Sequence, residues 1–157
     1  MIAAQPQTEF STSLSPGEVE IILVPPVSLN ERIEAEMRKH IEPAIEKSHG
    51  RILIDEVIEK VISGKMQLWF SMSDTECVGA AITHVTTWGS GKKSVGLLLA
   101  GGKDNMYRNT GPTMQKVEEF AELLGCSSVL VNGRKGWERA LPEGYKFTNA
   151  VFEKEIA

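Results

Sequence analysis

Hydrophobic positions along the chain recur with two different periods, and these predict where helices and strands lie. Apolar residues spaced three and four apart predict a helix over residues 30–40, capped by Ser28 or Asn30, and a second over 54–62. Alternation with a period of two predicts strands over 66–72 and 77–85. A short β-branched run at 19–24, stopped by two prolines, predicts a further strand.

The second half of the chain predicts a strand–helix–strand unit. Residues 95–100 are apolar on both faces, which is typical of an inner strand, and Gly101-Gly102-Lys103 is expected to break it. Asn109 or Thr110 would then cap a helix with Pro112 in its first turn, ending at Gly125. A buried strand over 126–131 follows, parallel to the first because a helix intervenes. The remaining predicted elements are a short helix over 134–141 and a closing strand over 145–155.

This order of elements predicts one mixed α/β (α+β) domain, with a central twisted sheet and helices on both faces. Residues 1–17 are rich in Ser, Thr, Gln and Pro, which predicts a flexible N-terminal segment before a domain over 18–157. A length of 157 residues is enough for one such domain.

Composition narrows the classes of function. The net charge is −4, which argues against a dedicated nucleic-acid binder, and no apolar run is long enough to span a membrane. The two cysteines, Cys77 and Cys126, form neither a metal-ligand pattern nor a disulfide framework. We therefore expect no metal, and a reduced, cytoplasmic setting.

The order of elements, together with the segment GRKGWERALPEGYKF at residues 133–147, resembles the GCN5-related N-acetyltransferases (GNATs) over residues 19–156. More narrowly, the segments SGKMQLW, GCSSVLVNGRKGWERAL and GYKF resemble short GNAT-like proteins of tailed phages and prophages. The resemblance implies a fold in which two parallel strands splay apart around acetyl-CoA, and an acyl-CoA-binding protein that acetylates an amine. It also implies the cytoplasm of a bacterial host, or association with a virion.

The resemblance assigns the cofactor to the loop between the strand and the helix of the central unit. The residues expected to bind it are Leu99, Gly101, Gly102, Lys103, Arg108, Asn109, Thr110 and Gly111. The family's phosphate loop is Gln/Arg-x-x-Gly-x-Gly/Ala, and its closest counterpart here, residues 108–111, is cut short by Pro112, which lacks an N–H donor. The alternative is an ordinary solvated loop before a capped helix.

Acetyl transfer to an amine requires a base and an acid for the departing thiolate. Glu76 and His84 are the candidate bases, although the simpler interpretation is a hairpin carboxylate for Glu76 and a partly buried structural histidine for His84. Many GNATs carry a tyrosine acid four residues before the glycine of the last turn. Counting back from Gly144 gives Ala140 here, so only Tyr145 could replace that acid, with a different geometry.

A tryptophan flanked by charges, Trp137 with Arg134 and Arg139, is a candidate partner surface, because Trp and Arg dominate binding interfaces. Its alternative is a helix anchor that packs on the sheet. A partner protein or a second copy of the chain could occupy such a surface. The rival to an enzyme is thus a non-enzymatic accessory or virion protein built on the same fold, and the sequence does not identify an amine acceptor.

Overall fold

A single mixed sheet forms the centre of this computed structural model, which describes residues 14, 18–103, 106–133 and 135–156. Within those residues the strands follow the order β1-β2-β3-β4-β5, and all neighbouring pairs are antiparallel except β4 and β5. The strands are β1 (Glu20–Val24), β2 (Met66–Met72), β3 (Cys77–Thr87), β4 (Lys93–Gly102) and β5 (Ser128–Val131). The predicted parallel pairing of the last two strands is confirmed.

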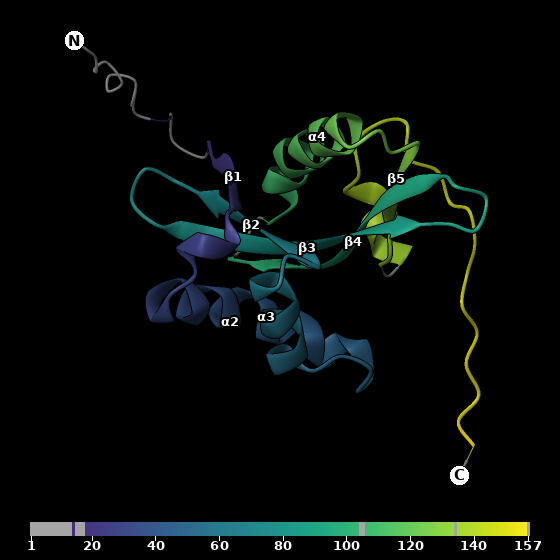
Figure 1. The fold of residues 1–157 in the computed structure, drawn as a ribbon, viewed down its shortest axis with the longest axis horizontal. Coiled ribbons are helices and arrows are strands. Elements are labelled where there is room, and N and C mark those ends of the chain that lie inside the picture. The colour runs from purple at the N-terminus through teal and green to yellow at the C-terminus, as the bar shows by residue number, and fades with distance from the viewer. Residues whose placement is uncertain (1–13, 15–17, 104–105, 134, 157) are drawn as a thin grey trace.

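Helices cover both sides of the sheet (Figure 1). The helices α2 (Glu31–Ile45) and α3 (Ile54–Ile62) lie on one side, which we call the α2/α3 face, and α4 (Met106–Leu123) lies on the other, the α4 face. Three short 3-10 helices complete the described elements: η1 (Pro26–Ser28), η2 (Glu46–Ser48) and η3 (Lys135–Arg139). The predicted mixed sheet with helices on both faces is confirmed.

The first two predicted helices form as their hydrophobic spacing indicates. The side chain of Asn30 accepts a hydrogen bond from the N–H of Ile33 at 2.9 Å, which caps α2. Gly64, just after α3, has a φ of +81°, the left-handed conformation expected of a glycine that ends a helix. α2 continues to Ile45, beyond the predicted end at residue 40, and Pro43 lies inside the helix.

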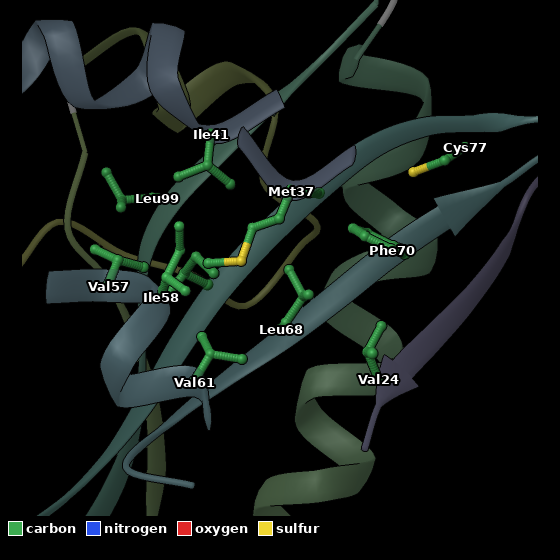
Figure 2. Close-up of a cluster of buried hydrophobic side chains, with 12 residues drawn as sticks. Val24, Met37, Ile41, Val57, Ile58, Val61, Leu68, Phe70, Cys77 and Leu99 are labelled. Atoms are coloured by element: carbon green, nitrogen blue, oxygen red, sulfur yellow. The ribbon is translucent and has the colours of Figure 1, made fainter. Parts of the chain in front are cut away.

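A hydrophobic core lies on each face of the sheet. Figure 2 shows the core of the α2/α3 face, where Met37, Leu68 and Ile82 are wholly inaccessible to solvent. The core of the α4 face is built around Trp69, Met114 and Val117. Because side chains alternate along a strand, neighbouring residues of β2 serve different cores.

A β-bulge interrupts the alternation in β4. Ile82 of β3 pairs with Leu99, but the next residue, Thr83, pairs with Leu97, so Leu98 has no partner. As a result Leu98 and Leu99 both pack into the core of the α2/α3 face. Leu97 and Ala100, on either side of them, both contact the core of the α4 face.

Two boundaries in the central unit differ from the prediction. β4 continues through Gly102, so the two glycines do not break the strand. α4 begins at Met106, so Pro112 lies inside the helix and not in its first turn. A proline removes one helical hydrogen bond, but its fixed φ is compatible with a helix, and packing of Met114 and Val117 holds the helix on the sheet. Gly125, with a φ of +72°, follows the helix as predicted.

The C-terminal part departs furthest from the prediction. The expected helix over 134–141 is a 3-10 helix, and no strand forms in the described residues after β5, so the predicted closing strand is wrong. Strand-forming side chains require a neighbouring strand to pair with, and this segment runs away from the sheet (Figure 1). It is tied back by a hydrogen bond from the Tyr145 hydroxyl to Glu118 (2.8 Å) and an ion pair between Arg51 and Glu153 (3.0 Å).

The predicted flexible segment, residues 1–17, lies outside the described residues except for Leu14, whose N–H donates to Asp74. None of the helices in the described ranges combines the length and apolar character that crossing a membrane requires.

Candidate functional site

The parallel strands β4 and β5 separate partway along their length. They pair from Ser94 and Ser128 to Leu97 and Val131, and the N–H of Asn132 makes the last bond to Leu97 at 3.1 Å. β4 then continues to Gly102, while the chain after β5 turns toward η3. In the part of the chain that the structure describes, this second half of β4 is paired on one side only, with β3.

A small hollow lies on the α4 face where the strands separate. Its cavity volume is about 30 Å³. One water molecule needs roughly 10–15 Å³ on this scale, so the hollow admits only a small chemical group. The lining residues come from β2, β3, β4, α4 and η3: Trp69, Ser71, Gly79, Ala80, Ala81, Leu97, Ala100, Gly101, Gly102, Thr110, Thr113, Met114 and Trp137.

Glycines leave bare backbone on one side of the hollow. A Cβ at Gly79 would lie 3.0 Å from the carbonyl oxygen of Gly101, and one at Gly102 would lie 2.7 Å from that of Val78. At Gly101 a Cβ would collide with the backbone carbonyl of His40 on α2. These positions therefore exclude side chains, as is usual where backbones approach closely.

Two tryptophans stand beside this bare backbone. Trp69 is 4% exposed, donates its indole N–H to the hydroxyl of Thr83 at 2.9 Å, and meets the ring of Phe120 edge-on. Trp137 packs so closely over Gly133 that a Cβ there would lie 2.6 Å from the indole. Both rings are held in place, so these walls of the hollow are preformed.

The first turn of α4 begins just beyond the end of β4. Residues 104 and 105 lie outside the described residues, and the helix starts at Met106. The unpaired N–H groups of a first helical turn attract anions. Since Pro112 lies well beyond that turn, it does not remove one of these donors, which corrects the objection drawn from the sequence.

The residues predicted to bind a cofactor are only partly brought together. Gly101, Gly102 and Thr110 line the hollow. Lys103 follows β4 and forms an ion pair with Glu76 at 2.6 Å, whereas Leu99 packs in the core of the opposite face. Gly111 is an exposed residue inside α4; the side chains of Arg108 and Asn109 are outside the described parts.

The three predicted catalytic residues lie apart, and none of them lines the hollow. Glu76 ends the β2–β3 turn, where the hydrogen bond and charge of Lys103 hold its pKa below the usual value. His84, on β3, lies beside Gly96 of the neighbouring strand β4. Burial of its imidazole is the main cause that lowers its pKa, and the positive charge of Lys60 lowers it further. Burial, together with Glu118, raises the pKa of Tyr145 above that of an ordinary phenol. Their catalytic roles stay predictions.

The described residues of the predicted partner surface differ in their exposure to solvent. Trp137 is half-buried and faces the hollow, whereas Arg139 is exposed to solvent. Arg134 lies outside the described residues. Sequence reasoning missed the contributions of Ser71, Gly79 and Ala100; a glycine within an apolar strand, as at Gly79, signals close backbone approach and could have indicated the place.

Comparison with solved structures identifies the fold. An aminoglycoside acetyltransferase from an uncultured soil metagenomic sample superposes with a TM-score of 0.64 at 14% identity, over 88% of this chain and 97% of its own. A ribosomal-protein-alanine N-acetyltransferase from Brucella melitensis biovar Abortus 2308 gives 0.60 at 11% identity, over 87% and 99%. A GNAT family acetyltransferase from Staphylococcus aureus gives 0.58 at 11%, over 88% and 99%. No family model matches the sequence, nor does any curated protein. The chain has the fold of the GNAT acetyltransferases.

Proposed function

We propose that this protein binds an acyl-CoA at the separation of β4 and β5 and transfers the acyl group to an amine. The observation that carries the proposal is the end of the β4–β5 pairing at Leu97 and Val131. The free edge of β4, the hollow and the first turn of α4 lie close together at this place. The structural neighbours named above are acetyltransferases, which supports the proposal.

The residues present fit the two ends of such a cofactor. The hollow is the size of a small acyl group, and its lining includes three residues with hydroxyl groups, Ser71, Thr110 and Thr113, among apolar residues. The phosphates would lie at the N–H groups of the first turn of α4. Lys103, one residue beyond β4, would supply positive charge there if it left Glu76. When bound, the cofactor supplies the activated acyl thioester.

The described residues that line the hollow include no general base. Among its described lining residues, none has an ionisable side chain. We therefore propose that the amine enters in its neutral form, held by the lining hydroxyls, and that catalysis rests on positioning. The rate should rise with pH until the acceptor amine has lost its own proton.

Thermal melting with acetyl-CoA tests binding. At 100 times the dissociation constant, the ligand should add about 2.7 kcal/mol to the free energy of unfolding. For a domain of this size that raises the melting temperature by about 5 to 10 °C. Ala100→Leu, which fills the hollow, should abolish the shift; Ala44→Leu, at a half-buried alanine of the α2/α3 face, should keep it. An equal shift in both variants would contradict the proposed position.

Two fragments separate the ends of the cofactor. Coenzyme A lacks the acyl group, and acetyl-pantetheine lacks the pyrophosphate. If the phosphates lie at α4, coenzyme A should retain most of the shift, and Lys103→Ala with Arg108→Ala should reduce it. An unchanged shift in the double variant would show that the phosphates bind elsewhere.

The absence of an ionisable group among the described lining residues also favours a second candidate, a binding protein without transferase activity. Such a protein could be the accessory or virion component that the phage resemblance implies. Measuring thiol release from acetyl-CoA with an aminoglycoside and with an alanine-terminated peptide distinguishes the two. A thermal shift without thiol release from either acceptor would favour the binding protein.

A further inference from the structure

A buried group of metal-binding side chains lies on the α2/α3 face, away from the hollow. Glu36 and His40 stand one helical turn apart on α2, and Cys77 is the first residue of β3. One potential ligand atom from each lies within 4.8 Å of those of the other two. The imidazole of His40 is only 3% exposed, and Cys77 stands at the margin of the core drawn in Figure 2.

Two polar atoms in this group are buried without a hydrogen bond. They are Oε2 of Glu36 and Nε2 of His40, which lie 3.3 Å apart in an arrangement that does not satisfy hydrogen-bond geometry. Buried polar atoms in folded proteins almost always have a partner, because leaving one unpaired forfeits its hydration. Both atoms belong to the same small cluster, so a single additional ligand could satisfy them together.

We propose that Glu36, His40 and Cys77 form a binding site for a zinc ion. Carboxylate oxygen, imidazole nitrogen and thiolate sulfur are the donors that zinc prefers, and three protein ligands leave the fourth position to water. Zinc bonds of about 2.0 to 2.3 Å in tetrahedral geometry place neighbouring ligand atoms roughly 3.3 to 3.7 Å apart. The separation of Nε2 and Oε2, 3.3 Å, falls in that range.

Entry of the ion requires two changes that the structure allows. The Glu36 side chain is 35% exposed, which gives a route from solvent. The Cys77 thiol now donates a hydrogen bond to the carbonyl of Gly79 at 3.3 Å, so on coordination it must give up this bond and release its proton to solvent. The bound ion would join α2 to the start of β3, beside the place where the His40 carbonyl contacts Gly101.

Titration of the metal-free full chain with zinc and cobalt(II) tests the site. We expect one zinc ion per chain, a rise in melting temperature with zinc, and the thiolate-to-cobalt absorption of a tetrahedral site with cobalt(II). Cys77→Ser and His40→Gln should each weaken zinc binding by at least about 10-fold. The matched control is Cys126→Ser, which removes the other free cysteine, outside the cluster, and should leave binding and absorption unchanged.

Several outcomes would overturn the proposal. One is a wild-type chain that binds no zinc, and another is a Cys77→Ser variant that binds zinc as tightly as wild type. Loss of the cobalt absorption in Cys126→Ser would assign the metal to the other thiol. If Cys77→Ser fails to fold, as judged by circular dichroism, Glu36→Gln gives the same test, because its side chain is partly exposed and its shape is conserved. Unchanged zinc affinity in Glu36→Gln would exclude the carboxylate as a ligand.

Discussion

The two faces of the sheet use the same strands for different purposes. On β2, Leu68 and Phe70 pack into the α2/α3 face, among large aliphatic side chains that exclude solvent. The residue that follows each of them faces the other way: Trp69 and Ser71 line the hollow. Of the buried polar side chains in the described residues, three lie on this side of the sheet: Ser71, Thr83 and Thr110. One face is built to hold the fold, and the other leaves space and polar atoms next to it.

The largest effect should come from the α2/α3 face. Ile82→Ala removes a fully buried side chain, and we expect the free energy of unfolding to fall by about 2 to 5 kcal/mol. Denaturant unfolding measures this loss. The thermal shift with acetyl-CoA should persist, because Ile82 does not line the hollow. A stable variant that has lost the shift would mean that the two faces are not separate in function.

Alanine substitutions at two glycines should have the next largest effect on stability, and the sign of the effect should differ between the two positions. Gly101→Ala puts a Cβ against the His40 carbonyl, which should destabilise the protein by about 1 to 3 kcal/mol. Gly111→Ala lies in α4 with open space around it and should stabilise by about 0.5 to 1 kcal/mol. The melting temperature of each variant, compared with that of the wild type, measures these two effects. Destabilisation of equal size in both would show that space at Gly101 is not the reason for its glycine.

Removing one hydrogen bond from the wall of the hollow should have a smaller effect. Trp69→Phe keeps a ring against Phe120 but loses the 2.9 Å bond to Thr83, at a cost of about 1 kcal/mol plus the lost ring volume. Trp88→Phe is the control: it loses a comparable bond to Ser94, but its side chain is half exposed, so water can replace the bond. Chemical denaturation should therefore separate the two, and equal losses would contradict the difference in burial.

The smallest effect concerns the ion pair at the end of β4. The pKa of Glu76 is lower in the folded chain than in the unfolded one, so the pair stabilises the fold above the ordinary carboxyl pKa of about 4.3. That contribution is lost as the pH falls through the lowered folded value. Glu76→Gln should thus be slightly less stable than wild type at pH 7 and equal to it near pH 2, by denaturant unfolding. A difference that grows toward low pH would have the wrong sign.

Local spacing predicted most of the fold. The stripes of α2 and α3, the alternation of β2 and β3, and the glycines at 64 and 125 are properties of neighbouring residues, and the structure confirms them. The predicted start of α4 was too late, because proline prefers the first turn of a helix and Pro112 was therefore placed there. In the structure Pro112 lies inside the helix, which the packing of Met114 and Val117 holds on the sheet. The closing strand failed for a related reason, since its side chains favour a strand but, in the described residues, this segment pairs with no strand of the sheet.

The candidate sites were harder to predict because their residues meet only through the fold. Gly79 and Gly101 approach each other because β3 and β4 pair, and Trp137 joins them through the turn after β5. Glu36 and His40 are one turn apart in sequence, but Cys77 reaches them from β3. No local sequence pattern contains such distances, so the cysteine count alone could not indicate this candidate site.

The bulge at Leu98 gives β4 one residue more than its pairing with β3 requires, so the strand could lose that residue and keep its register. Deleting this one residue would restore regular alternation and leave the residues around it on their present faces, because Leu97 and Leu99 would then be consecutive partners of Thr83 and Ile82. Leu99 would still point into the aliphatic core and Ala100 toward the hollow, so the packing would lose only the side chain of Leu98. Alignments with related chains should therefore allow a single-residue gap at this position, because a shift of one residue there would compare opposite sides of the sheet.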